Sequence, residues 1–191
     1  VEVAEPPRFV SRGGLKLEGA LEHFHVGPAG LACLDVGAST GGFTDCLLQR
    51  GAVRVFAVDV GRGQLHDRIA RDERVLALDK TNAHHPFELP SQVELATVDV
   101  SFISLTQVLP NVVPHLSTGG RILCLVKPQF EAGKKQVGRG GVVKDPQVHG
   151  AVLAKVGLWA LDRGIRVRGL VRSVIRGPAG NVEYFALLQI G

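Results

Sequence analysis

Four charged residues, widely separated in the sequence, could carry out a proton transfer if the fold brings them together. They are Lys16, Asp99, Lys127 and Glu183. A lysine amine can take a proton from an alcohol, a far weaker acid than any protein carboxyl, when burial and neighbouring cations lower its pKa. Carboxylates can position such a base and hold a second lysine. Each residue alone also has an ordinary explanation as a surface or strand-end charge, so the hypothesis requires that the four converge.

A glycine-rich turn between a predicted strand and a predicted helix, residues 34–43, could hold a nucleoside. Its glycines, which let the backbone approach a ligand closely, are Gly37, Gly41 and Gly42. The turn is not a P-loop, because Phe43 stands where a lysine is required, and Ser39 breaks the dinucleotide fingerprint. Asp35 would repel a pyrophosphate but could hold an ammonium group. A cationic nucleoside without phosphates therefore fits best, although ordinary strand-to-helix turns also use glycine.

Two further acids are placed to meet such a ligand. Asp59 ends the second predicted strand, at the position where an acid accepts hydrogen bonds from an adenosine ribose. Asp79 ends the third predicted strand and could face the adenine. For both residues the alternative is a turn or helix-capping role.

Alternating strands and helices must position these residues. From Leu31 onward, short apolar runs alternate with amphipathic stretches, which is typical of βαβ units in a parallel sheet. Strands are expected at 32–36, 53–58, 75–77, 95–98, 121–126, 166–174 and 183–189, and helices at 11–23, 43–50, 105–114 and 146–163. We predict one α/β domain over residues 1–191, with a Rossmann-like, seven-stranded, mostly parallel sheet covered by helices on both faces.

One connection is long enough to be functional. The segment from Phe130 to Asp145 is rich in glycine and lysine and follows the fifth strand, at the edge where such sheets bind ligands. It is a candidate lid or binding element; the alternative is a disordered surface loop.

The composition is that of a folded domain outside the membrane. Of the 191 residues, 45% are hydrophobic and 21% are charged, which excludes a disordered chain. The apolar runs fall short of the ~18 residues that a membrane helix needs, and the acidic, proline-containing start does not resemble a secretion signal. The sequence contains no methionine, so we expect a processed chain or a fragment.

The cysteines and histidines do not indicate a metal site. Cys33, Cys46 and Cys124 are odd in number, widely spaced and set in apolar sequence, so we expect buried free thiols and a cytoplasmic location. The pair His84–His85 has no accompanying carboxylate or cysteine pattern.

Basic residues gather in three clusters although the net charge is only +4. The clusters are Arg8, Arg12 and Lys16; Lys134, Lys135, Arg139 and Lys144; and the five arginines from Arg163 to Arg176. They favour an anionic partner, the alternative for each cluster being a solvated surface. Trp159 and Tyr184 are too few for a base-stacking platform, so contact with a nucleic acid should depend mainly on arginine and lysine.

Seven ordered segments, spanning nearly the whole chain, resemble a known family. They are VSRGGLKLEGAL at 10–21, DVGASTGGFTDCLL at 35–48, AVDVGRGQL at 57–65, DVSFISL at 99–105, VKPQFE at 126–131, GRGGVVKD at 138–145 and GNVEYF at 180–185. They resemble the methyltransferase domain of the TlyA (hemolysin A-like) ribosomal RNA 2′-O-methyltransferases, relatives of the FtsJ branch.

The resemblance implies a reaction, a cofactor and partners. The expected reaction is methyl transfer from S-adenosylmethionine to cytidine 2′-hydroxyls of ribosomal RNA, with ribosomal RNA or ribosomal subunits as partners. The Lys-Asp-Lys-Glu tetrad of the family maps onto Lys16, Asp99, Lys127 and Glu183, with Lys127 as the base. The residues expected to hold the cofactor are Asp35, Gly37, Ser39, Gly41, Gly42, Phe43, Asp59, Asp79, Asn82 and Asp99. Family members also carry an N-terminal S4-type RNA-binding domain, which this sequence lacks.

Three alternatives stay open at this point. The family's historical name suggests a membrane-active hemolysin, but the sequence shows no membrane span and no signal. A non-catalytic RNA-binding module is disfavoured by the complete tetrad. A methyltransferase for proteins or small molecules is disfavoured by the pair of lysines, because such substrates seldom need so strong a base.

Overall fold

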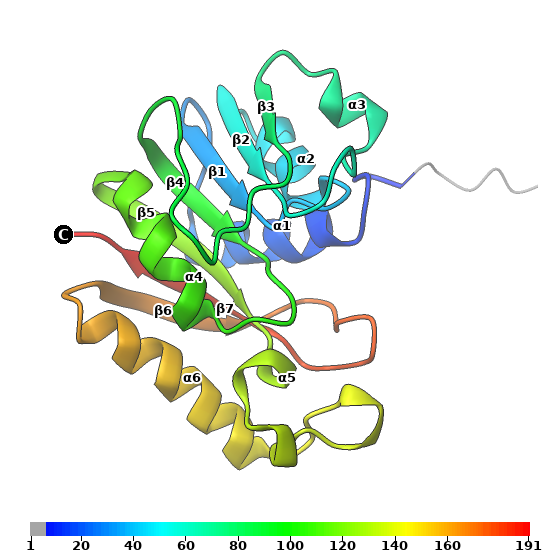
Figure 1. Ribbon diagram of the computed structural model, residues 1–191, viewed down its shortest axis with the longest axis vertical. Helices are drawn as coiled ribbons and strands as arrows, with labels where there is room; N and C mark the ends of the chain where they lie inside the picture. The colour runs from blue at the N-terminus through cyan, green and yellow to red at the C-terminus, as the bar shows by residue number, and fades with distance from the viewer. Residues whose placement is uncertain (1–6) are drawn as a thin grey trace, which may run out of the picture.

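The structure is a computed structural model that describes residues 7–191 and contains a seven-stranded sheet in the order β3-β2-β1-β4-β5-β7-β6 (Figure 1). The strands are β1 (Ala32–Val36), β2 (Arg54–Val58), β3 (Val75–Leu78), β4 (Val93–Val98), β5 (Leu116–Val126), β6 (Arg166–Arg172) and β7 (Tyr184–Gln189). The helices are α1 (Gly13–Phe24), α2 (Gly42–Gln49), α3 (Asp67–Ala70), α4 (Leu105–Val112), α5 (Pro128–Glu131) and α6 (Pro146–Leu161). The predicted Rossmann-like α/β fold is confirmed. Residues 1–6, whose composition argued against a secretion signal, lie outside the described residues.

The sheet separates two apolar clusters and is buried between them. β1 and β4 pair in parallel at its centre, and their inward side chains are almost fully buried. One cluster joins the sheet to α4 and α6, and the other joins it to α1 and α2. Parallel strands buried on both faces are typical of doubly wound folds. Since the chain order reverses between β1 and β4, a crevice opens at the carboxyl ends of these strands.

The last strand runs against the others. β7 pairs antiparallel with both β5 and β6, with Tyr184 opposite Val126. The residues just before β7 therefore lie at the same sheet edge as the residues just after β5. This reversal brings Glu183 toward the carboxyl ends of the parallel strands.

All seven expected strands and all four expected helices are present, with changed ends. Glu183 precedes β7 rather than beginning it, and β5 starts five residues earlier than expected, because Leu116 pairs with Val93 through a register shift. The helix expected at 105–114 is α4, and it ends at Val112, since Pro114 has no N–H to continue it. A 3₁₀ turn follows at Val113–His115. The short helices α3 and α5 were not predicted.

The segment from Phe130 to Asp145 is more ordered than the loop that the sequence predicted. Its first two residues belong to α5, and two 3₁₀ turns follow at Lys134–Gln136 and Arg139–Gly141. The side-chain amide of buried Asn181 makes two hydrogen bonds to the backbone of this segment. It accepts from Val143 N and donates to Gly141 O. Within residues 7–191, no helix is both long and apolar enough to cross a membrane.

Candidate active site

Lys127 and Asp99 form an ion pair at the carboxyl ends of β5 and β4. Lys127 Nζ lies 2.5 Å from Asp99 Oδ1, and it donates a hydrogen bond to Ser101 Oγ at 3.0 Å. The contact with Asp99 is off the direction of a hydrogen bond, and Oδ1 has no donor within the described residues. Both side chains are mostly buried. The pair therefore holds an amine at the crevice with one carboxylate oxygen still able to accept.

Lys16 and Glu183 form a second, deeper ion pair. Lys16 Nζ donates to Glu183 Oε2 at 2.6 Å, and Glu183 is only 1% exposed. Glu183 Oε1 is buried and has no donor among the described residues. A Cβ at Gly177 would lie 2.3 Å from this oxygen, so the glycine leaves room for the carboxylate. The pair joins α1 to the residue just before β7.

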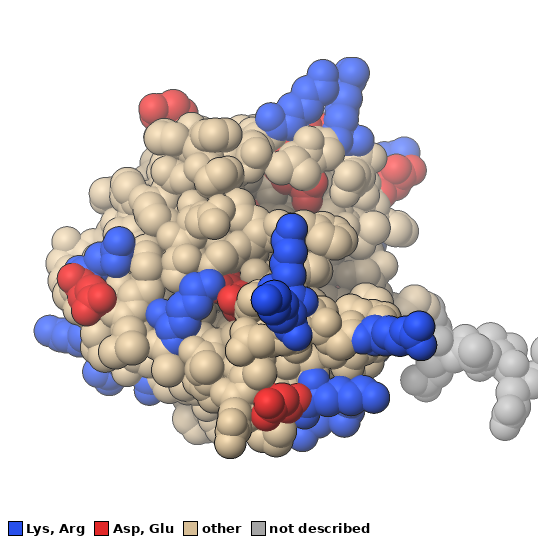
Figure 2. Space-filling model, turned by 60° about the horizontal axis from the view of Figure 1, so that its bottom comes forward, with Lys and Arg blue, Asp and Glu red and all other residues tan. Residues whose placement is uncertain are grey.

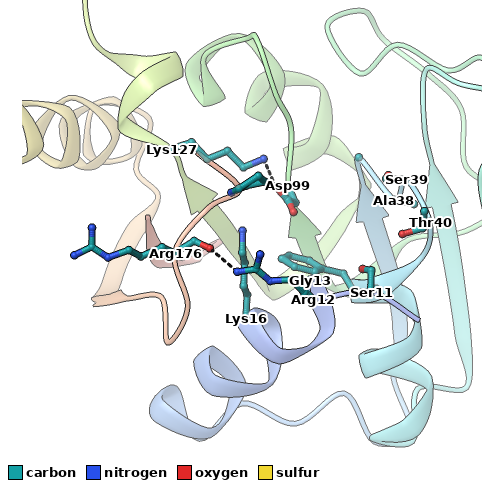
Figure 3. A pocket seen from close by; sticks show the side chains of 14 residues that line it. Ser11, Arg12, Gly13, Lys16, Ala38, Ser39, Thr40, Asp99, Lys127 and Arg176 are labelled. Carbon is teal, nitrogen blue, oxygen red and sulfur yellow. Dashed lines mark hydrogen bonds and ion pairs between the residues drawn. The ribbon is translucent and has the colours of Figure 1, made fainter. Parts of the chain in front are cut away.

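Three of the four residues line one cavity of about 410 Å³ (Figure 3). Lys16 rises into it from α1, while Asp99 and Lys127 enter from the strand ends opposite. Arg12 crosses the mouth and donates to the carbonyl of Arg176 at 3.2 Å. Glu183 lies behind Lys16 and lines a neighbouring cavity. The predicted convergence of the four residues is therefore present.

The glycine-rich turn forms the opposite wall of this cavity. Gly37 has φ +83°, and a Cβ there would lie 2.2 Å from the carbonyl oxygen of Asp99, so only glycine fits. Gly42 begins α2, which directs backbone N–H groups toward the cavity. Phe43 and Ser39 also line it, as expected.

A second cavity of about 450 Å³ adjoins the first and shares Gly37, Ser39 and Asp99 with it. The carboxylate of Asp59 lines it and accepts from the backbone N–H groups of Ser39 and Gly61 at 2.8 Å. Asn82 lines it as well, and the remaining wall is largely apolar, formed by Val58, Val60, Ala83, Val100, Phe102, Ile103 and Val108. The joined cavities combine an acid, an apolar slot and a helix N-terminus.

Three residues expected to touch the cofactor lie outside the lining of both cavities. Asp35 is fully buried in β1 and accepts hydrogen bonds from the hydroxyls of Thr44 and Thr97. Gly41, with φ +93°, turns the chain against Ile69 instead of facing the cavity. Asp79 accepts from the backbone N–H of Gly63 and so fixes the loop after β2. All three support the cavity walls from behind.

Burial raises the pKa of Asp35 to about 6, although the hydrogen bonds from Thr44 and Thr97 lower it and the charge of Asp99 raises it. Because this pKa exceeds that of the unfolded chain, Asp35 favours the folded state below pH 4, and this contribution disappears as the pH rises toward 6. Asp35→Asn should therefore raise the free energy of unfolding at pH 7.5, by at most about 3 kcal/mol. Urea titrations between pH 4 and 7.5 should show the gain growing with pH; a constant difference would contradict this assignment.

Two aromatic residues lie beside Lys127, the exposed Phe102 and the partly buried Phe130. Phe130 begins the candidate lid that the sequence predicts, whereas Phe102 was not predicted as a site. Phe102 is 90% exposed with φ +64°, and its ring centroid lies 4.8 Å from that of Phe130. Both line a third cavity, of about 720 Å³, together with Lys127, Glu183 and residues of the 134–141 segment. The prediction that nucleic-acid contact depends mainly on arginine and lysine was based on the scarcity of tryptophan and tyrosine, and it left out phenylalanine. The signal that could have found Phe102 is its position three residues after Asp99.

A buried carboxylate fastens the segments that follow β4 and β5 to each other. Glu131 of α5 accepts from Ser104 Oγ and Leu105 N, both at 2.6 Å, and thereby caps α4. Lys155 of α6 pairs with it at 2.9 Å. The distance between the Asp99 and Lys127 segments is thus set by contacts outside the cavities. No sequence pattern singles out Glu131 for this role.

The cysteines are free and buried, as expected. Burial raises the pKa of the Cys33, Cys46 and Cys124 thiols to about 12, so none is a reactive thiolate at neutral pH. No group of three or more histidine, cysteine or acidic side chains in the described part of the chain could hold a metal ion.

Comparison with known proteins gives one consistent result. The FtsJ-like methyltransferase family model matches residues 9–190. The chain is 50% identical over 183 residues to the 16S/23S rRNA (cytidine-2′-O)-methyltransferase TlyA of Mycobacterium tuberculosis, covering 95% of this chain and 68% of that relative. A crystal structure of a hemolysin-named protein from Lactococcus lactis has a TM-score of 0.93 and 46% identity, covering 97% of this chain and 90% of that chain. A SAM-dependent methyltransferase from Aquifex aeolicus shares the fold, with a TM-score of 0.65 and 19% identity over 95% of this chain and 94% of that chain.

Proposed function

Because the chain belongs to the FtsJ-like methyltransferase family, we infer that it transfers a methyl group from S-adenosylmethionine to a cytidine 2′-hydroxyl of ribosomal RNA. The observation that carries this function furthest is the convergence of Lys16, Asp99 and Lys127 on a cavity walled by the glycine-rich turn. Glu183 completes the set through its ion pair with Lys16.

The joined cavities have the chemistry that S-adenosylmethionine requires. The Asp59 carboxylate would accept hydrogen bonds from the ribose hydroxyls, and the apolar wall with Asn82 would hold the adenine. The turn at Gly37 and the N-terminus of α2 would hold the amino acid portion. When bound, the cofactor supplies an electrophilic methyl group on a positively charged sulfonium.

Lys127 would act as the base. Its amine lies at the boundary of the first and third cavities, so a ribose in the third cavity would present its 2′-hydroxyl to Nζ. Asp99 and Ser101 hold the amine in place. In its neutral form, Lys127 would take the proton of the 2′-hydroxyl and so make the oxygen nucleophilic. Lys16, held by Glu183, would bind the ribose through its remaining ammonium protons.

The third cavity would receive the target nucleotide. It lies beside Lys127 and offers Phe102 and Phe130 as aromatic surfaces for a base. Basic side chains are spread over the face that carries α5, α6 and the 134–141 segment, and acidic ones are fewer there (Figure 2). Such a surface suits the phosphates around a flipped-out nucleotide.

The function is tested with the purified chain, labelled S-adenosylmethionine and unmethylated small and large ribosomal subunits. Label should enter ribosomal RNA at a cytidine ribose and should resist removal by conditions that strip base or protein methyl groups. Calorimetric titration should show binding of S-adenosylmethionine and none of NAD. Cofactor binding without any transfer to either subunit would favour a non-catalytic module instead.

Replacing Phe102 with alanine should weaken binding of the ribosomal RNA more than binding of the cofactor, because the ring is 90% exposed and lines the third cavity as well as the second. Stacking of a base on an aromatic side chain contributes about 1–3 kcal/mol, so KM for ribosomal RNA should rise about 5- to 150-fold. Phe102→Tyr retains the ring and serves as the matched control. Equal KM values for Phe102→Ala and the wild type would exclude this ring as a stacking surface.

A further inference from the structure

One stretch of the chain carries only positive charge. Residues 163–182 include no aspartate or glutamate, and their arginines are Arg163, Arg166, Arg168, Arg172 and Arg176. Three of these lie on β6, which is the outermost strand and pairs only with β7. All three are exposed there.

These arginines are not neutralised by the protein. None of the five forms an ion pair within residues 7–191, and the side-chain hydrogen bonds of Arg163 and Arg176 go to backbone carbonyls. Elsewhere in the chain Arg50, Arg68 and Arg74 each contact a carboxylate within 2.9 Å. The positive charge of the β6 edge is thus available to an outside anion.

The row leads away from the active site. Both β5 and β6 run antiparallel to β7, so Arg172 is level with Tyr184 and with Val126, the residue before Lys127. Arg166 is level with Gln189 at the other end of the strand. Arg176 lines the cavity that contains Lys16 and Asp99. At about 3.3 Å per residue, the strand alone extends the row by about 20 Å.

We propose that this edge, residues 163–176, binds the phosphate backbone of the ribosomal RNA beyond the target nucleotide. The proposal rests on the proposed function, which supplies an RNA substrate longer than the active-site cavities. Guanidinium groups bind phosphate oxygens through paired hydrogen bonds, so unpaired arginines in a row fit an RNA strand. Edge strands also carry charges that prevent pairing with another sheet. Charges of either sign would serve that role, so it does not explain why all the charges are positive or why the arginines continue to the cavity at Arg176.

The experiment compares Arg168→Gln/Arg172→Gln with Arg54→Gln/Arg71→Gln. The control pair removes the same charge from exposed arginines on β2 and after α3. Methyl transfer is measured against the concentration of protein-free ribosomal RNA and of subunits, at several salt concentrations, and cofactor affinity is measured by calorimetry. For the β6 variant we expect KM for RNA to rise about tenfold, with kcat and cofactor affinity unchanged. The salt dependence of log KM should become shallower by about 0.7 for each lost phosphate contact.

Two results would overturn the proposal. The first is a KM equal to that of the control variant. The second is a loss confined to subunits, which would indicate a ribosomal protein as the partner. The variant Arg168→Lys/Arg172→Lys keeps the charge but loses the paired hydrogen bonds, so its KM should lie between those of the wild type and the glutamine variant. Since the wild type is assayed alongside, absence of transfer by the wild type would reject the proposed function and not the edge contact.

Discussion

Lys127→Ala should lower kcat for ribosomal RNA methylation by about 10²- to 10⁴-fold, the usual contribution of a general base. The change removes the only amine that contacts Asp99 among the described residues. The glycine-rich turn and Asp59 are not touched, so the affinity for S-adenosylmethionine should stay within about threefold of the wild type. Single-turnover methylation and calorimetry measure the two quantities separately.

Lys127→Arg tests whether Lys127 acts as a proton acceptor or only through its positive charge. The guanidinium can still pair with Asp99, but it stays protonated at all accessible pH values and cannot accept a proton. Its kcat should therefore be as low as that of Lys127→Ala. Substantial activity in Lys127→Arg would show that Lys127 acts by charge alone and that another group removes the proton.

Glu183→Ala should lower the free energy of unfolding and abolish methylation activity. It leaves the Lys16 ammonium buried without its partner, a change that typically costs about 3–5 kcal/mol. Chemical denaturation should show this loss in the free energy of unfolding. Activity should fall even where the variant is fully folded, because Lys16 is then no longer held at the cavity.

The matched control is the double variant Lys16→Met/Glu183→Ala. Removing both charges leaves no unpaired buried ion, so the double variant should be more stable than Glu183→Ala alone, while still inactive. If the double variant were as unstable as the single one, the lost stability would come from packing around Glu183 and not from the ion pair.

The elements of the fold were predictable because their signals are local. β1 and β4 are short and mostly apolar, which is typical of buried parallel strands. The short helix α5 escaped prediction because four residues are too few for a helical period to be visible. Its position depends on Glu131 and Lys155, whose contacts are made only in the folded chain.

The site was predictable where a charged residue directly follows a predicted strand. Asp99 and Lys127 follow adjacent strands, so their meeting follows from the sheet order. Asp35 was assigned to the cofactor because an acid before a glycine-rich turn could face the ligand. Its position within β1 turns the side chain toward Thr44 and Thr97 instead, and no sequence pattern shows which face of a fully buried strand meets the cavity.

The ion pair of Lys16 with Glu183 joins residues 167 positions apart in the chain. Closing so long a loop is entropically costly and slow, so contacts of this kind form late in folding. A chain with its first six strands already formed would still hold no complete tetrad. Recovery of methyl transfer during refolding should therefore follow the slowest folding phase. Its time course would measure when Lys16 and Glu183 come into contact.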